Sequence, residues 1–92
     1  NLALDYGELK EYKYAANTYE KLWKVTPDSA KAQDALYNAS FFSVKAKDWR
    51  NAIRINKQYV EMYPKSADAE NMFYNMAEYY LKLDDLDQAN RI

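Results

Sequence analysis

The sequence predicts an all-α fold, an α-solenoid of antiparallel helix pairs in which a 37-residue repeat occurs about two and a half times. The first observation is that one segment recurs without a gap after 37 residues, a period typical of helical repeat arrays. The second is that apolar residues within each unit recur at three- and four-residue steps, as on one face of a helix. The third is that one Gly and two Pro supply too little turn chemistry for a many-stranded β fold.

The repeat is marked by two prolines, Pro27 and Pro64, which begin matching segments. Residues 27–55 and residues 64–92 share 11 identities in 29 aligned positions. The same shift, applied once more, aligns Asn1 with Asn38. We therefore divide the chain into a partial repeat at 1–27, a whole repeat at 28–64 and a partial repeat at 65–92. Because the chain begins and ends inside expected helices, we interpret it as a fragment of a longer array.

The first helix of the whole repeat is predicted from about residue 30 to residue 46. Its buried face consists of small and apolar residues at helical spacing: Ala32, Ala35, Leu36, Ala39, Phe42, Ser43 and Ala46. Ser29 is placed to cap the N-terminus of this helix through its hydroxyl, and Ser66 occupies the same place in the next unit.

The second helix is predicted to begin after Asp48, which is placed as its N-cap, and to end at about Tyr63. Pro64 stops it, because proline restricts the preceding residue and cannot donate to the backbone ladder. The predicted buried face is formed by Trp49, Ala52, Ile53, Tyr59, Val60 and Tyr63. Asn56 interrupts this face, and we interpret it as a residue that bonds locally or marks the convex edge.

The two helices of a unit are joined by a tight turn, predicted at Lys47-Asp48 and, by alignment, at Lys10 and at Asp84-Asp85. Small residues should let the helices approach closely where they cross. In the second helices these small residues are the aligned Ala15, Ala52 and Ala89, next to the larger Tyr12, Trp49 and Leu86.

The composition excludes several classes of function. A net charge of −1 gives no basic footprint for nucleic acid, and the absence of His and Cys removes the common metal ligand sets and any His-based triad. Gly7 is the only glycine, so there is no glycine-rich phosphate loop. We expect no enzyme activity, no cofactor, no metal and no nucleic-acid partner, and no transmembrane segment in this chain. Arg50, Arg54 and Lys57 are interpreted as a solvated helix face.

The chain resembles the tetratricopeptide repeat family. The residues that carry the resemblance are Leu2-Ala3 with Tyr6, Ala39-Ser40, Met76-Ala77 with Tyr80, the aligned alanines of the second helices, and the closing Pro27 and Pro64. The repeat departs from that family in its length, since 34 residues are usual, and in having no glycine in the helix–helix turn. The resemblance implies that the first helix of each pair lines a concave surface that binds other proteins.

A narrower resemblance rests on the segment Pro27-Asp28-Ser29-Ala30-Lys31-Ala32 and its copy after Pro64. It is similar to bacterial envelope proteins such as the outer-membrane β-barrel assembly lipoprotein and the periplasmic partner of the Tol–Pal system. This resemblance implies a location in the bacterial periplasm or at the outer membrane, with the cytoplasm as the alternative.

The candidate binding residues are those on the first helices that do not belong to the packing face. They are Asp34, Tyr37, Asn38, Phe41, Lys45, Asn71, Tyr74, Asn75, Glu78 and Lys82. Asn amides can hold the backbone of an extended peptide, and Tyr and Phe rings offer flat apolar contact. The alternative is that the amides bond between neighbouring helices and the aromatic rings pack against the next repeat.

Three functions are therefore open. The first is a non-catalytic scaffold whose concave face receives a peptide or helix of a partner protein, in bacterial envelope assembly or maintenance. The second is a structural spacer or self-associating module. The third is a sensor domain for a small molecule such as a sugar or muropeptide, with Tyr37 and Tyr74 as stacking platforms.

Overall fold

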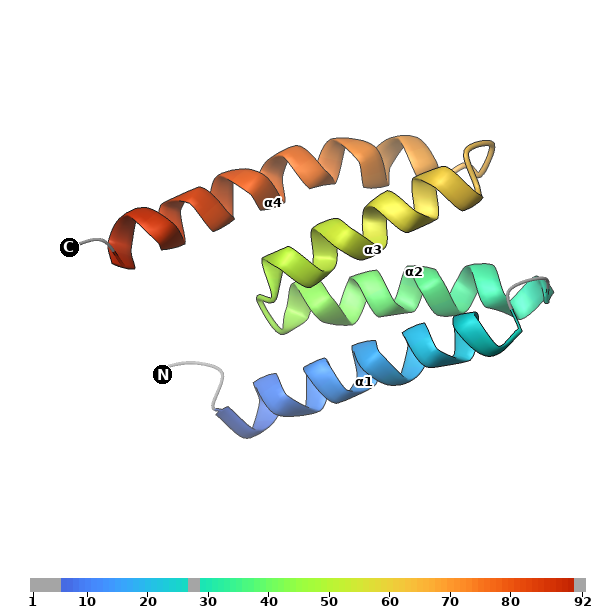
Figure 1. Ribbon diagram of the computed structural model, residues 1–92, viewed down its shortest axis with the longest axis horizontal. Coiled ribbons are helices and arrows are strands. Elements are labelled where there is room, and N and C mark those ends of the chain that lie inside the picture. The colour runs from blue at the N-terminus through green and yellow to red at the C-terminus, as the bar shows by residue number, and fades with distance from the viewer. Residues whose placement is uncertain (1–5, 27–28, 91–92) are drawn as a thin grey trace.

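The computed structural model describes residues 6–26 and 29–90. The described residues form four helices: α1 (Tyr6–Val25), α2 (Ala30–Lys45), α3 (Trp49–Met62) and α4 (Ala69–Asn90). Each helix packs against the next one in the chain, and successive helices run in opposite directions (Figure 1). The predicted all-α helical repeat fold is confirmed. Within the described ranges, none of the helices combines the length and the hydropathy that a membrane span requires.

The 37-residue period reappears in the packing of the side chains. Tyr12 of α1 stacks on Phe42 of α2, with ring centroids 6.1 Å apart and planes inclined by 27°. Trp49 of α3 stacks on Tyr79 of α4 at 5.7 Å and the same 27°. Both partners are displaced by 37 residues, so α1 with α2 and α3 with α4 are two copies of one helix–helix contact.

The core lies between α2, α3 and α4. Leu36 and Ala39 of α2, Ile55 and Tyr59 of α3 and Met72 of α4 are buried together. Leu36, Ala39 and Tyr59 belong to the predicted buried faces, whereas Ile55 and Met72 were not among the residues predicted to be buried.

The two predicted caps of the whole repeat are confirmed. The hydroxyl of Ser29 accepts a hydrogen bond from the backbone N–H of Lys31 at 3.1 Å, and Asp48 Oδ1 accepts one from Asn51 at 3.4 Å. Each cap satisfies a donor that the first turn of a helix otherwise leaves without a partner.

The turn between α2 and α3 is built around Lys47, whose φ angle of 58° places it in the left-handed region. The backbone N–H of Lys47 donates to the carbonyl oxygen of Val44, and that of Asp48 donates to Ser43, both at 2.9 Å. This pair of hydrogen bonds is the Schellman arrangement that ends many helices, in which glycine is the usual left-handed residue.

The predicted turns at Lys10 and at Asp84-Asp85 are wrong, because α1 and α4 run through them without a break. A turn interrupts the backbone ladder, and that cost is offset where the second helix buries a face, as α3 does against α2. The residues beyond Asp85 make only about two helical turns, which bury little area if they fold back. The same argument applies to the few described residues before Lys10, so a continuous helix is favoured at both places.

Two local predictions also need correction. Ser66 was expected to cap α4, but α4 begins at Ala69, and the hydroxyl of Ser66 instead accepts from the backbone N–H of Asp68 at 3.2 Å. Ser66 therefore orders the turn before the helix. In α1 the fully buried small residue is Ala16 rather than Ala15, which stays partly exposed. Ala52 is buried as expected, and the side chain of Ala89 lies outside the described part of the structure.

Candidate functional site

A groove with a volume of about 330 Å³ lies between α2 and α4, the first helices of two successive units. It exists because α3 packs against both helices and holds them apart, so that α2 and α4 have no direct backbone contact in the described structure. The groove is lined by Tyr37, Ser40, Phe41, Val44, Asn56, Asp68, Asn71, Met72, Asn75 and Tyr79.

The floor of the groove is polar and is centred on Asn56, which α3 places at the junction of three helices. The hydroxyl of Ser40 on α2 donates to Asn56 Oδ1, and Asn56 Nδ2 donates to the backbone carbonyl oxygen of Met72 on α4 at 3.0 Å. Asn56 is fully buried. The interpretation of Asn56 as a locally bonded or convex-edge residue is therefore wrong: it ties the three helices together from the inside.

One wall of the groove is aromatic. Tyr37 and Phe41 of α2 are 41% and 47% exposed, although both are large. Their rings are held by edge contacts, Tyr37 against Tyr59 with centroids 6.3 Å apart and Phe41 against Phe42 at 5.3 Å. The two rings are thus positioned by the protein while much of their surface remains available for contact.

The opposite wall is made of amides. Asn71 and Asn75 of α4 are exposed and line the groove one helical turn apart. An amide can donate and accept at once, which matches the alternating groups of a peptide backbone. Tyr79 closes the side near α3. Burial raises the pKa of its hydroxyl, and the carboxylate of Glu78 adds to the effect, so the group stays protonated near neutral pH.

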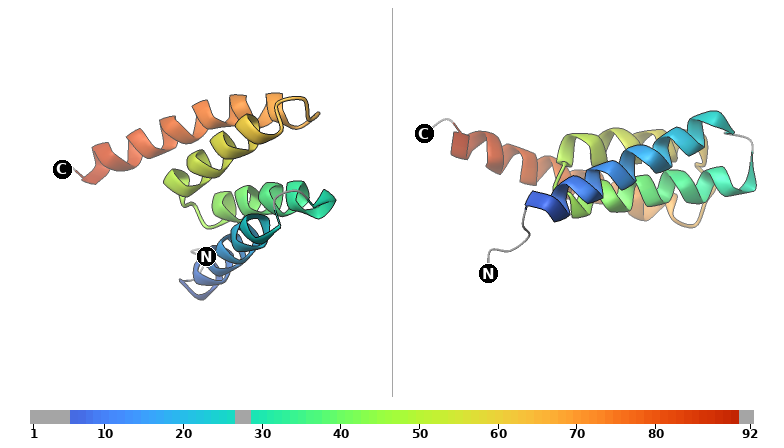
Figure 2. Two further views of the ribbon diagram at one scale, coloured as in Figure 1. Left: turned by 45° about the vertical axis from the view of Figure 1, so that its right-hand side comes forward. Right: turned by 90° about the horizontal axis from the view of Figure 1, so that it is seen from below.

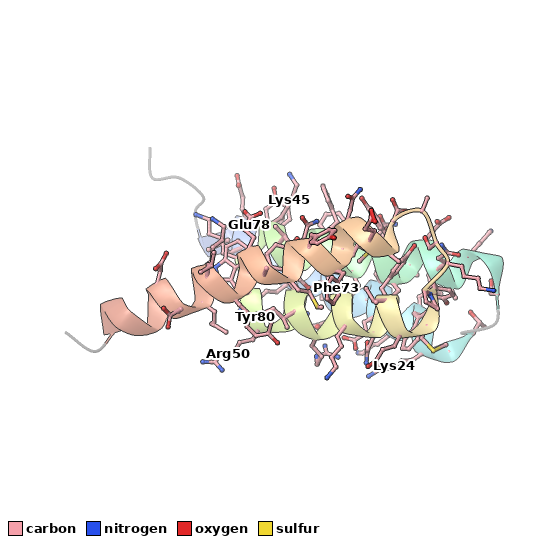
Figure 3. The ribbon with its side chains drawn as sticks, turned by 90° about the horizontal axis from the view of Figure 1, so that it is seen from above. Lys24, Lys45, Arg50, Phe73, Glu78 and Tyr80 are labelled. Atoms are coloured by element: carbon pink, nitrogen blue, oxygen red, sulfur yellow. The ribbon has the colours of Figure 1, made fainter. Side chains whose placement is uncertain are left out.

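The structure divides the ten candidate residues into two groups. Four of them line the groove: Tyr37, Phe41, Asn71 and Asn75. The other six lie outside it: Asp34, Asn38, Lys45, Tyr74, Glu78 and Lys82. Asn38 is half-buried, whereas the other five are exposed. Tyr74 leans its ring edge on Phe73 at 5.9 Å. Figure 3 shows Lys45 and Glu78 on one side of the helix stack and Arg50 and Lys24 on the other.

Lys45 and Lys82 repeat one contact in successive units. Lys45 Nζ lies 5.7 Å from the ring centroid of Tyr12 and 5.2 Å from that of Phe41, and Lys82 Nζ lies 5.4 Å from that of Trp49. The rings attract the ammonium groups and limit the directions in which these long side chains point.

Sequence reasoning missed the floor of the groove, formed by Ser40, Asn56, Met72 and Tyr79, together with Val44 and Asp68 at its edges. Ser40 and Asn56 are polar residues within otherwise apolar stripes. That interruption is the signal that could have drawn attention to them, because buried polar side chains pair with one another.

A second polar contact connects α1 with α3. Arg54 donates from Nη1 and Nη2 to the two carboxylate oxygens of Glu20 at 2.6 and 2.7 Å, and Lys24 Nζ lies 3.6 Å from the same carboxylate. The hydrogen bond from Arg54 holds the pKa of Glu20 below its usual value, and Glu20 raises the pKa of Arg54. Arg54 is therefore paired with Glu20, while its side chain stays 47% exposed, as expected for a solvated helix face.

Residues 34–66 match the family described as Tetratricopeptide repeat. The matched segment runs from the first turns of α2 through α3 to the turn before α4. Repeats of this family generally mediate contacts between proteins. Neither the curated proteins nor the solved structures include a match to this chain.

Proposed function

We propose that this chain is part of a tetratricopeptide repeat scaffold that receives an extended peptide of a partner protein in the groove between α2 and α4. The observation that carries the proposal is the pairing of two half-exposed, positioned rings, Tyr37 and Phe41, with the amides of Asn71 and Asn75 across the groove. Rings supply apolar contact area, and amides supply hydrogen bonds to a backbone of any sequence.

The dimensions of the groove suit a short extended segment. A helix of 16 residues such as α2 is about 24 Å long, which corresponds to about seven residues of an extended chain. A partner helix would need a wide apolar face, whereas the floor at Ser40 and Asn56 is polar. An extended peptide is therefore the better fit.

The experiment that tests the proposal is a capture of partners by the immobilised chain from a bacterial envelope extract. We expect Tyr37→Ala/Phe41→Ala to lose the captured protein and to keep the helical circular dichroism spectrum. The matched control is Tyr14→Ala, which removes an exposed ring from α1. Partners retained equally by all three proteins would refute binding in the groove.

We further propose a bacterial periplasmic or outer-membrane setting, on the strength of the Pro27-Asp28-Ser29-Ala30-Lys31-Ala32 segment alone. Capture from separated periplasmic and cytoplasmic fractions tests this setting. A partner found only in the cytoplasmic fraction would count against the envelope and leave the groove proposal intact.

A second candidate function, self-association, is favoured by an exposed strip on α4. Phe73 is 55% exposed although its equivalent, Leu36, is fully buried, and Tyr80 is 57% exposed where Ser43 is buried. Leu22 of α1 is likewise exposed. Figures 1 and 2 show that α4 projects past the end of α3. By the 37-residue shift, α4 corresponds to α2 and α1 corresponds to α3. Phe73 and Tyr80 on α4 of one copy could therefore pack on the face of α1 that carries Leu22 in another copy, as α2 packs on α3.

A further inference from the structure

We infer that a second copy of this chain docks head to tail, with α4 of the first copy against α1 of the second, and that this contact builds a second groove from residues of both copies. The second groove presupposes the self-association proposed above, and it adds a binding site that neither copy forms alone. Its ligand is an extended peptide that presents apolar side chains to the floor.

The template for the contact is the packing of α2 on α3 within one chain. On α2 it uses three buried residues: Leu36, Ser40 and Ser43. On α3 it uses four residues that pack against or hydrogen-bond to those three: Ile55, Tyr59, Asn56 and Asn51. The 37-residue shift relates α2 to α4 and α3 to α1. The equivalent faces of α4 and α1 are therefore the two sides of a contact between copies.

Both faces are open in the described part of the structure. On α4 the equivalents of the three buried residues are exposed: Phe73, Ala77 and Tyr80. On α1 the equivalents of the four partners are exposed or half-buried: Thr18, Leu22, Tyr19 and Tyr14. Leu22 is 50% exposed, whereas Tyr59, at the same place of α3, is 1% exposed. Contiguous exposed apolar residues of this kind mark contacts with other molecules.

The two faces compensate each other in size. Phe73 is larger than its equivalent on α2, Leu36. The residue opposite it, Thr18, is smaller than its equivalent on α3, Ile55. A packed contact tolerates an exchange that conserves volume. The strip on α4 therefore fits α1 of a second copy as α2 fits α3.

A second pair of residues shows the same compensation. Tyr19 is larger than its equivalent, Asn56, and the residue opposite it, Ala77, is smaller than Ser40. The exchange replaces the hydrogen bond between Ser40 and Asn56 by contact between a ring and a methyl group. The centre of the contact between copies is therefore more apolar than its template.

Two places do not compensate, and both lie at the ends of the contact. Tyr14 and Tyr80 are both larger than their equivalents, which lie beside the turn that joins α2 to α3. No turn ties α4 to α1 of another copy, so the helices can separate slightly there and the two rings can stack. At the other end Glu70 takes the place of the half-buried Gln33, where its carboxylate stays at the solvated edge.

The docked copies place the second groove between α4 of the first copy and α2 of the second. Its walls are the 37-residue equivalents of Tyr37, Phe41, Asn71 and Asn75, namely Tyr74 and Glu78 from one copy and Asp34 and Asn38 from the other. At the edge Lys31 takes the place of Asp68. These four wall residues lie outside the first groove, and the contact between copies gives them a common site.

The floor of the second groove is more apolar than that of the first. Tyr19 stacks on Phe42 with ring centroids 5.7 Å apart and planes inclined by 4°. The two rings stand at the places of Asn56 and Tyr79. A flat pair of rings offers contact area to apolar side chains, and Asn38 supplies an amide for the peptide backbone.

The test measures the distance across the second groove in a pair of variants that can form only this contact. The first copy carries Leu22→Asp, which blocks its α1 face, and a nitroxide label on Tyr74→Cys. The second copy carries Phe73→Ser/Tyr80→Ser, which blocks its α4 face, and a nitroxide label on Asn38→Cys. The chain has no cysteine of its own, so each copy carries one label.

The reference is a single chain labelled at Tyr37→Cys/Asn75→Cys, across the first groove, with Leu22→Asp to keep it monomeric. Its two labelled positions differ by 37 residues from those of the pair. Double electron–electron resonance should therefore give the same most frequent distance for the mixed pair and for the reference. Either member of the pair alone should give no distance, and every variant should keep the helical circular dichroism spectrum.

Two results would overturn the inference. A pair that forms in sedimentation velocity but gives a different distance would leave self-association standing through other surfaces, without the second groove. Absence of any pair at millimolar protein would remove the second groove and the head-to-tail contact together. Peptide binding in the first groove is decided separately, by capture from envelope extract, since it needs only one copy.

Discussion

Asn56 donates a hydrogen bond from Nδ2 to the backbone carbonyl oxygen of Met72 at 3.0 Å, and its Oδ1 accepts one from the hydroxyl of Ser40. One side chain on α3 thereby joins α2 to α4 beneath the groove. A buried amide of this kind stabilises the fold only while both of its ends are satisfied. The same contact therefore holds the helices together and fixes the floor of the groove.

Replacing Asn56 should destabilise the protein strongly for a single polar residue. Asn56→Ala removes both hydrogen bonds and leaves Ser40 unpaired in the interior, so we expect a loss of about 1–3 kcal/mol in the free energy of unfolding. Urea unfolding followed by circular dichroism measures it. The control is Lys57→Ala, at the next residue of α3, whose side chain is exposed; it should change the free energy of unfolding little. A combined Ser40→Ala/Asn56→Ala protein should lose less than the sum of the single changes.

The loss in the free energy of unfolding should depend on which partner of the Glu20–Arg54 ion pair is replaced. Arg54→Ala leaves the buried carboxylate of Glu20 with only Lys24 nearby, and we expect a loss of about 1–3 kcal/mol, less than for a fully buried pair because Arg54 is 47% exposed. Glu20→Gln should cost less, since it leaves a solvated guanidinium. Denaturant midpoints of the two variants measure the difference, and equal losses would contradict the assignment of Glu20 as the buried member.

The same pair predicts how stability depends on pH. The pKa of Glu20 is lowered in the folded protein, chiefly by the hydrogen bond from Arg54. The stabilisation is therefore complete above the ordinary value of 4.5 and is lost as the pH falls through the lowered pKa. We expect the stability gap between the native protein and Glu20→Gln to narrow from pH 7 to pH 3. A gap that stayed constant over this range would show that the carboxylate charge contributes nothing.

Self-association should depend on the exposed strip of α4. If α4 of one copy packs on α1 of the next, the contact is open-ended, so the mean mass should rise continuously with concentration. Phe73→Ser/Tyr80→Ser should abolish this rise in sedimentation velocity, whereas Tyr37→Ser, in the groove, should leave it unchanged. A monomeric native chain at every concentration would remove self-association as a candidate function.

The features of the fold that depend on local sequence were predictable. Ser29 and Asp48 cap helices because a short polar side chain reaches the first backbone donors, an interaction that needs no distant partner. The turn at Asp84-Asp85 could not be judged in this way, because its stability depends on a second helix to pack against. A polar pair of residues predicted a turn at both places, but the structure has a turn at Lys47-Asp48 and a continuous helix at Asp84-Asp85.

The candidate site was predictable only in part. Tyr37, Phe41, Asn71 and Asn75 followed from the helical period, which separates the front of a helix from its packing face. Helical spacing placed Asn56 on the buried face of α3, but its partners, Ser40 on α2 and Met72 on α4, follow only from how the three helices meet in space. The residues that form the two walls of the groove were therefore predicted, and those that form its floor were not.

Lys47 provides a test of the turn itself. Its φ of 58° costs a residue with a Cβ about 1 kcal/mol more than glycine, so Lys47→Gly should raise the free energy of unfolding by up to that amount. The control, Lys57→Gly in the middle of α3, should lower it by about 1 kcal/mol, because there glycine only adds freedom to the unfolded chain. Urea unfolding of both variants and of the native chain at one pH measures the two changes in the free energy of unfolding, which should have opposite signs. Destabilisation by both substitutions would mean that the left-handed turn at Lys47 does not form in solution.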